Sequence, residues 1–108
     1  MKNVILSADG DRVVYSVPDE VAENLEQCCI EFCDKWLWTS PDAEKYRVDG
    51  VVRYNEADFI EYLNKWIFPN QPSNYIDCLR SIDFADSLPD KYKNCPQFNF
   101  LIKQSIGV

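Results

Sequence analysis

The sequence predicts an α+β fold, in which a small antiparallel sheet of two hairpins packs against a single layer of two amphipathic helices on one face. Two short β-branched runs each adjoin an Asp-Gly dipeptide, and two longer segments repeat apolar residues with the helical period. The 108 residues are 46% hydrophobic and 14% aromatic, which is enough for one core. We expect residues 1–100 to form one globular domain and residues 101–108 a C-terminal tail, whose composition does not distinguish a strand from an unstructured end.

Two Asp-Gly dipeptides predict the hairpins. Val4–Ala8 and Val13–Val17 are β-rich runs on either side of Asp9-Gly10. A two-residue hairpin loop requires positive φ, which Gly adopts freely and Asp adopts better than most residues. Asp49-Gly50 is a second turn of this kind and precedes the run Val51–Tyr54.

The first helix is predicted from Asp19 to Trp38, a length of about 30 Å. Pro18 suits a helix start, and the acidic Asp19 and Glu20 complement the positive end of the helix dipole. One side is apolar and is expected to face the core: Val21, Ala22, Leu25, Cys28, Cys29, Phe32, Cys33, Trp36 and Leu37. The other side is expected to face solvent: Glu20, Glu23, Asn24, Gln27, Glu31, Asp34, Lys35 and Trp38.

A second helix follows after a break. Residues 41–47 begin with proline, are polar, and predict a loop with at most one helical turn. Asn55 is a good N-cap with Asp58 three residues later, so the second helix begins there and ends near Phe68, before Pro69. Its apolar stripe consists of Phe59, Ile60, Leu63, Trp66 and Ile67.

The last third of the chain is less regular. Residues 73–84 fit either a short helix or a strand. From Ser87 onward prolines interrupt regular structure, and we expect Tyr92, Phe98 and Phe100 to fasten this segment to the domain.

The two halves of the chain echo each other. Asp9-Gly10, Val13-Val14 and Lys35-Trp36-Leu37 recur in form as Asp49-Gly50, Val51-Val52 and Lys65-Trp66-Ile67. This pattern suggests two hairpin-helix units, with chance similarity as the simpler alternative. No functional expectation depends on the echo.

The charge balance argues against several classes of ligand. Eleven basic and eighteen acidic residues give a formal net charge of -7, which repels the phosphates of nucleic acids and anionic lipids. No apolar stretch approaches the roughly 20 residues of a membrane span, and the apolar run after Lys2 is too short for a secretory signal. We therefore expect a cytoplasmic protein that binds neither nucleic acid nor membranes.

The chemistry-bearing residues argue against catalysis. Histidine, which titrates near neutrality without tuning, is absent. The helical spacing of Cys29 and Cys33 would suit a metal site, but their place among apolar residues favours reduced thiols in a core. We predict no catalytic residue, no cofactor and no metal, with a small carboxylate-based hydrolase as the less favoured alternative.

The first helix carries the most informative polar feature. From Asp19 to Asp34 there are six carboxylates and no basic residue. An exposed aromatic with a charged rim is typical of a protein interface. We therefore predict a binding module, an inhibitor or immunity-type protein for a basic partner such as a nuclease or toxin domain; a self-associating structural or regulatory domain is the alternative. The predicted interface comprises Glu20, Glu23, Glu31, Asp34 and Trp38.

Overall fold

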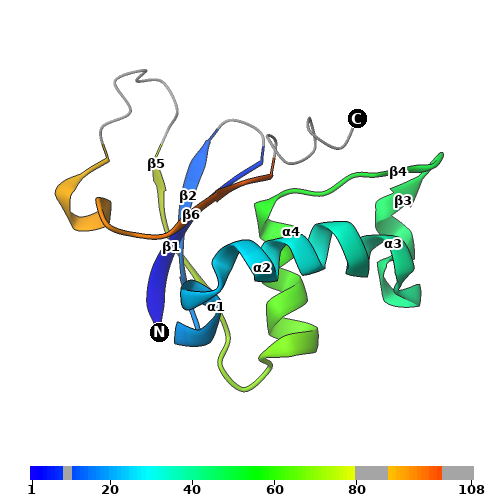
Figure 1. Cartoon of the computed structure of the whole chain (residues 1–108), viewed down its shortest axis with the longest axis horizontal. Coiled ribbons are helices and arrows are strands. Elements are labelled where there is room, and N and C mark those ends of the chain that lie inside the picture. The colour runs from blue at the N-terminus through cyan, green and yellow to red at the C-terminus, as the bar shows by residue number, and fades with distance from the viewer. Residues whose placement is uncertain (9–10, 80–87, 101–108) are drawn as a thin grey trace.

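A computed structural model describes residues 1–8, 11–79 and 88–100 of the chain. Its main sheet has four strands in the order β5-β2-β1-β6 (Figure 1). The strands are β1 (Lys2–Ser7), β2 (Arg12–Val17), β5 (Asn74–Leu79) and β6 (Gln97–Asn99). The predicted α+β class is confirmed.

The first hairpin forms as predicted. β1 and β2 pair antiparallel, from Lys2 opposite Val17 to Ser7 opposite Arg12. The predicted turn at residues 9–10 lies outside the described residues. β5 pairs antiparallel with β2, which resolves the first half of the 73–84 segment as a strand; its second half also lies outside the described residues.

The sheet is mixed, and in this detail the prediction was wrong. β6 pairs parallel with β1, with Leu6 opposite Phe98. Parallel neighbours require a long connection, and here almost the whole chain lies between the two strands. No local pattern within residues 97–99 indicates such a partner.

The second hairpin forms but does not join the main sheet. β3 (Arg47–Val48) and β4 (Val51–Val52) make a separate two-stranded sheet, which Figure 1 places near the C-terminal end of the first predicted helix, away from the main sheet. Asp49 (φ 53°) and Gly50 (φ 84°) both adopt positive φ, as a tight hairpin turn requires. The expectation that both hairpins share one sheet is therefore wrong, because strands of two residues offer too little backbone to extend the sheet.

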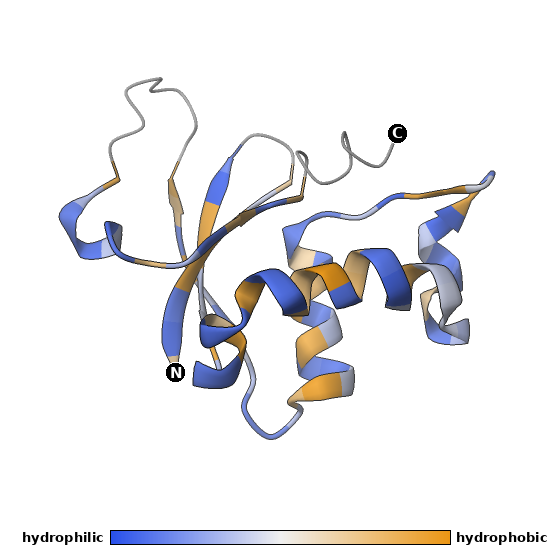
Figure 2. Cartoon of the chain, in the orientation of Figure 1, coloured by the Kyte–Doolittle hydropathy of each residue, from blue (hydrophilic) through white to orange (hydrophobic). Residues whose placement is uncertain are grey.

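The first helix is interrupted rather than continuous. Asn24 leaves helical geometry (φ -128°, ψ 39°), and the middle of the helix widens into a π-helix. The segments are α1 (Asp19–Glu23), α2 (Leu25–Ile30), the π-helix η1 (Glu31–Trp36) and α3 (Leu37–Thr39). The predicted core side is confirmed, since its members are buried except Cys28 and Trp36, which are half-buried. Figure 2 shows hydrophobic and hydrophilic residues alternating along this helix.

The segment after the first helix has more helix than predicted. Pro41–Tyr46 forms a 3₁₀ helix, η2, of six residues, which is about two turns. The Ser40 hydroxyl accepts a hydrogen bond from the Asp42 amide at its start, and Ala43 and Tyr46 are buried. These two anchors hold a polar segment in a helical form that its composition does not suggest.

The second helix begins at the predicted cap. Asn55 and Asp58 form a reciprocal capping box at the start of α4 (Glu56–Tyr62). The Asp58 amide nitrogen lies 3.1 Å from Asn55 Oδ1, and the Asn55 amide nitrogen lies 2.9 Å from Asp58 Oδ2. The helix continues as the π-helix η3 (Leu63–Ile67) and ends before Phe68 and Pro69, as expected.

Both faces of the main sheet are covered. Val4 and Leu6 of β1 pack with the helices, whereas Ile5 between them packs on the other side with Val14 and Tyr92. That second side is covered by the segment around the short 3₁₀ helix η4 (Asp90–Tyr92). Tyr92 and Phe100 are buried and Phe98 is partly buried, so the predicted aromatic anchors are confirmed. The proposed tail, residues 101–108, lies outside the described residues.

Candidate functional site

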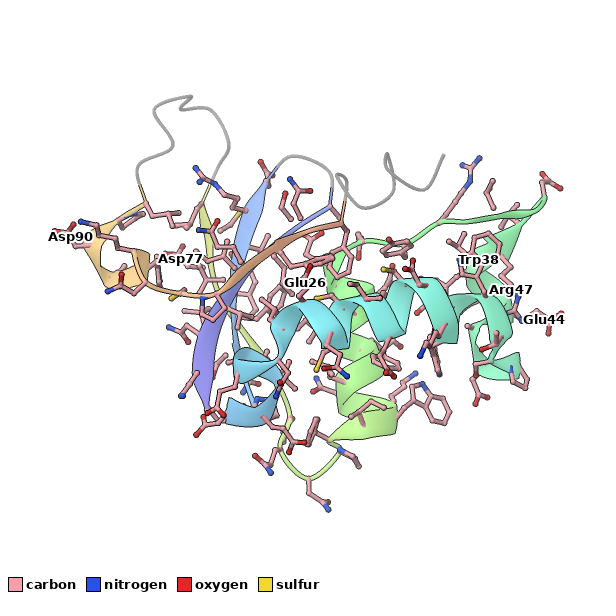
Figure 3. All side chains as sticks on the ribbon, viewed as in Figure 1. Glu26, Trp38, Glu44, Arg47, Asp77 and Asp90 are labelled. Atoms are coloured by element: carbon pink, nitrogen blue, oxygen red, sulfur yellow. The ribbon has the colours of Figure 1, made fainter. Side chains whose placement is uncertain are left out.

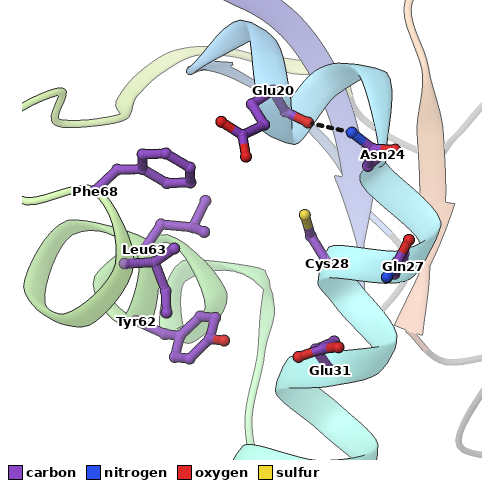
Figure 4. A pocket seen from close by; sticks show the side chains of 9 residues that line it. Glu20, Asn24, Gln27, Cys28, Glu31, Tyr62, Leu63 and Phe68 are labelled. Carbon is purple, nitrogen blue, oxygen red and sulfur yellow. Dashed lines mark hydrogen bonds between the residues drawn. The ribbon is translucent and has the colours of Figure 1, made fainter.

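A groove lies between the first helix and the second. Its volume is about 370 Å³, within the usual range of ligand pockets, and it is open to solvent on one side. Figure 4 shows its two walls facing each other. The lining residues are Glu20, Asn24, Gln27, Cys28, Glu31, Tyr62, Leu63, Ile67 and Phe68.

One wall of the groove is polar and carries the negative charge. Glu20 of α1 and Glu31 of η1 stand at its two ends, and the amides of Asn24 and Gln27 lie between them along the helix. Asn24 donates from Nδ2 to the Glu20 carbonyl oxygen at 3.0 Å. In Figure 4 the Glu20 carboxylate is directed across the groove toward Leu63 and Phe68.

The opposite wall is apolar and comes from the second helix. Tyr62, Leu63, Ile67 and Phe68 line it. The Phe68 amide donates to the Leu63 carbonyl oxygen at 2.7 Å, an i to i+5 hydrogen bond that closes the π-turn and places Phe68 beside the groove. Burial raises the pKa of Tyr62, and the negative charge of Glu31 adds to this rise.

The loop beyond this wall is fixed by one side chain. Asn64 accepts a hydrogen bond from the Ser73 amide at 2.6 Å and donates from Nδ2 to the Ser73 carbonyl oxygen at 3.1 Å. Ser73 is buried, so this amide pair ties the start of β5 to η3. The two hydrogen bonds of Asn64 therefore hold the loop after the apolar wall in place.

A single thiol faces the groove, and its surroundings keep it protonated. Burial raises the pKa of Cys28, and the nearby carboxylates of Glu20 and Glu31 raise it further. In Figure 4 its sulfur points into the groove. A nucleophilic cysteine requires the opposite environment, with a cation or a helix N-terminus lowering the pKa. The groove is therefore a poor site for thiol catalysis.

The structure separates the five predicted interface residues into two groups. Glu20 and Glu31 line the groove. Glu23 is exposed but accepts from Lys2 Nζ at 3.0 Å, so it already has a cation. Asp34 is exposed and interacts with the Cys33 thiol at 3.8 Å. Trp38 is 47% exposed in α3, near the second hairpin and away from the groove (Figure 3).

Neither carboxylate of the groove, Glu20 or Glu31, has a strong ion pair within the described part of the chain. Glu31 lies 3.9 Å from Lys35 Nζ, and both side chains are at least half exposed, so this pair is weak. Among the residues that the structure describes, no cation lies within 4.0 Å of the Glu20 carboxylate. Negative charge therefore remains at both ends of the groove.

Sequence reasoning missed the apolar wall. Of the predicted apolar stripe, Phe59, Ile60 and Leu63 are buried. Trp66 and Ile67 are 48% and 45% exposed, and of these two Ile67 lines the groove. The π-turn η3 adds a residue to the turn and so rotates the end of the helix away from a simple helical projection. An apolar excess before Pro69 was the only local signal of this surface.

The two helices that border the groove contain related sequences. The echo of Lys35-Trp36-Leu37 extends to eight residues, because EFCDKWLW at 31–38 matches EYLNKWIF at 61–68 in seven identical or similar positions. Both segments contain a π-helix, and in both a lysine pairs with the glutamate four residues earlier. Equivalent rings contact each other: Phe32 and Tyr62 lie 5.1 Å apart, and Trp36 and Trp66 lie 6.4 Å apart, between centroids.

Comparisons with protein-family models, curated proteins and solved structures find no match to this chain. Within residues 1–8, 11–79 and 88–100, no group of three or more Cys, Asp or Glu side chains is arranged to hold a metal ion. Over the same part of the chain, no helix has the length and apolar character needed to cross a bilayer. All five cysteines are free thiols.

Proposed function

We propose that this protein is a non-catalytic binding module that captures a basic protein partner, as an inhibitor or immunity-type protein does. The observation that carries the proposal is the groove, which has Glu20 and Glu31 on one wall and Leu63, Ile67 and Phe68 on the other. Protein interfaces combine apolar anchors with charges that select the partner and speed encounter. The net charge of -7 favours a basic partner and disfavours nucleic acid, and we place this interaction in the cytoplasm as part of the proposal.

The proposed interface keeps the five residues predicted from the sequence but does not give them equal weight. We place Glu20 and Glu31 at its centre because they line the groove, and Glu23, Asp34 and Trp38 at its margin because they do not. Exposed charges at the margin steer association but contribute little to affinity.

The test is affinity capture from the native cell at low and at physiological salt. Wild-type protein is compared with the charge reversal Glu20→Lys/Glu31→Lys and with Glu26→Lys/Glu44→Lys, which makes the same change in net charge at exposed positions outside the groove. We expect one basic protein in stoichiometric amount, retained by the control variant and lost by the groove variant. Recovery of no basic protein, or equal loss with both variants, would contradict the proposal.

Self-association is the second candidate, and one observation favours it. β5 is the outer strand of the main sheet order, and its Tyr75 and Ile76 are 61% and 44% exposed. Sedimentation velocity over a wide concentration range tests this alternative. A dimer that Tyr75→Lys abolishes would support it, and a monomer at all concentrations would exclude it.

A further inference from the structure

We propose that the groove binds an extended segment of the partner with the pattern basic-x-apolar-x-basic, in which two lysine or arginine side chains flank one apolar side chain. This inference rests on the proposed function and specifies the chemistry of the partner at the same site. It follows from the order of the groups along the groove, from its length and from its volume.

The ends of the groove suit cations. Glu20 and Glu31 are eleven residues apart along the helix, one at each end of the polar wall. Lys35 lies near Glu31 at 3.9 Å, but its side chain is 72% exposed, so a cation from the partner can take its place at little cost. A lysine or arginine at each end of a bound segment would therefore meet a carboxylate.

The middle of the groove suits an apolar side chain. Ile67 and Phe68 line this part of the groove together with Leu63, which is almost fully buried. Ile67 is 45% exposed, so a bound apolar group would remove its surface from water. An apolar residue between two basic ones places each group opposite its complement.

The amides of the polar wall favour an extended backbone. Asn24 and Gln27 lie between the carboxylates. The Gln27 amide offers a donor and an acceptor, and the Asn24 amide, which donates one N–H to the Glu20 carbonyl oxygen, offers its oxygen and its second N–H. An extended segment has free N–H and C=O groups to pair with them, whereas a helix uses its own internally. A volume of about 370 Å³ also holds a few side chains rather than a whole helix.

The length of the groove sets the spacing. In a straight helix, the Cα atoms of Glu20 and Glu31 would be about 16 Å apart at 1.5 Å per residue, a span that the flexible side chains at both ends can adjust by a few ångströms. In an extended segment, residues i and i+4 are about 13 Å apart, and i, i+2 and i+4 point to the same side. Two basic residues with one apolar residue midway between them therefore match the groove.

The experiment uses two labelled, end-blocked peptides of identical composition and the full chain. One peptide is Lys-Ser-Leu-Ser-Lys, which has the proposed spacing, and the other is Lys-Lys-Leu-Ser-Ser, in which the basic residues are adjacent. Fluorescence anisotropy measures binding to wild-type protein and to Glu20→Gln, Glu31→Gln and Glu26→Gln. Circular dichroism verifies that each variant is folded.

We expect the spaced peptide to bind at least about tenfold more tightly than the rearranged one. Glu20→Gln and Glu31→Gln should each weaken the spaced peptide by about tenfold, while Glu26→Gln, outside the groove on the same helix, stays within about twofold. Equal binding of the two peptides, or an equal effect of Glu26→Gln, would overturn the inference.

The two proposals fail in different ways. If affinity capture yields a basic partner that the groove reversal abolishes, but neither peptide binds, the segment pattern is wrong and the binding module stands. If neither a basic protein nor a peptide binds, both are wrong.

Discussion

The segments 31–38 and 61–68 have nearly the same sequence pattern and opposite surroundings. In the first, Leu37 is fully buried; in the second, the equivalent Ile67 is 45% exposed. Trp36 is partly buried, with Tyr46 of η2 packed 6.2 Å from it between ring centroids, whereas Trp66 is 48% exposed. The chain folds back over the first segment through η2, but after Pro69 it leaves the second segment for β5. The difference teaches that an apolar pattern specifies a helix without specifying what covers it.

The largest expected effect is at the ring that joins the two segments. Phe32 is fully buried and its centroid lies 5.1 to 6.2 Å from those of Trp36, Tyr54, Phe59, Tyr62 and Phe100. Phe32→Ala should lower the free energy of unfolding by about 3–5 kcal/mol, measured by urea denaturation. Tyr62→Phe, which keeps the ring at the equivalent position, should cost less than about 1 kcal/mol. A loss below about 1 kcal/mol for Phe32→Ala would contradict this packing.

The equivalent aliphatic residues Leu37 and Ile67 should differ clearly in their contribution to stability. Leu37→Ala should lower the free energy of unfolding by about 2–4 kcal/mol because it leaves a cavity. Ile67→Ala should cost about 1 kcal/mol, since nearly half of that side chain already contacts water. Chemical denaturation of both variants measures the difference, and equal losses would mean that the two segments are equally covered.

Of the two equivalent tryptophans, Trp36 should contribute more to stability than Trp66, by a smaller margin than Leu37 exceeds Ile67. Trp36→Ala removes a ring that stacks on Phe32 and contacts Tyr62 at 4.9 Å between centroids, so we expect a loss of about 2 kcal/mol. Trp66→Ala should cost about 1 kcal/mol. Thermal unfolding measures both, and a larger loss for Trp66→Ala would reverse the assignment of the exposed segment.

The smallest effect concerns the ion pairs of the two segments. Lys65 Nζ contacts Glu61 at 2.8 Å, and this hydrogen bond, with help from Lys45, lowers the pKa of Glu61. A carboxyl whose pKa is lower in the folded state stabilises the protein above its unfolded pKa of about 4.3, and loses this contribution as the pH falls through the folded pKa. Because Glu61 is 38% exposed, screening limits the contribution to below about 0.5 kcal/mol.

Glu61→Gln should therefore show a slightly flatter loss of stability than wild type as the pH falls below about 4.3. Denaturation at a series of pH values, at low and high salt, measures this difference. Identical slopes for the two proteins at low salt would mean that the Lys65 contact contributes nothing.

Much of the fold was predictable because its signals are local. Asp49-Gly50 formed a turn with positive φ at both residues, and Asn55 formed its capping box with Asp58. The buried side of the first helix followed from the helical period. Each of these features depends on residues within a few positions of one another.

The rest depends on partners distant in the sequence. The parallel pairing of residues 97–99 with β1, and the isolation of β3 and β4, have no counterpart in any short window. The candidate site was half predictable: Glu20 and Glu31 stood out as acidic residues on an exposed helix face. The exposed Ile67 did not, because it belongs to an apolar stripe, which reads as core unless the neighbouring element is known.

Local patterns were enough to establish an acidic α+β protein with two hairpins, two amphipathic helices and a negatively charged helix face. Only the packing of the second helix beside the first brought an apolar wall opposite two of those carboxylates. The physical reason is that turns, caps and helical periods arise from interactions along the chain, whereas a groove exists only between elements whose mutual placement is set by burial of the shared core.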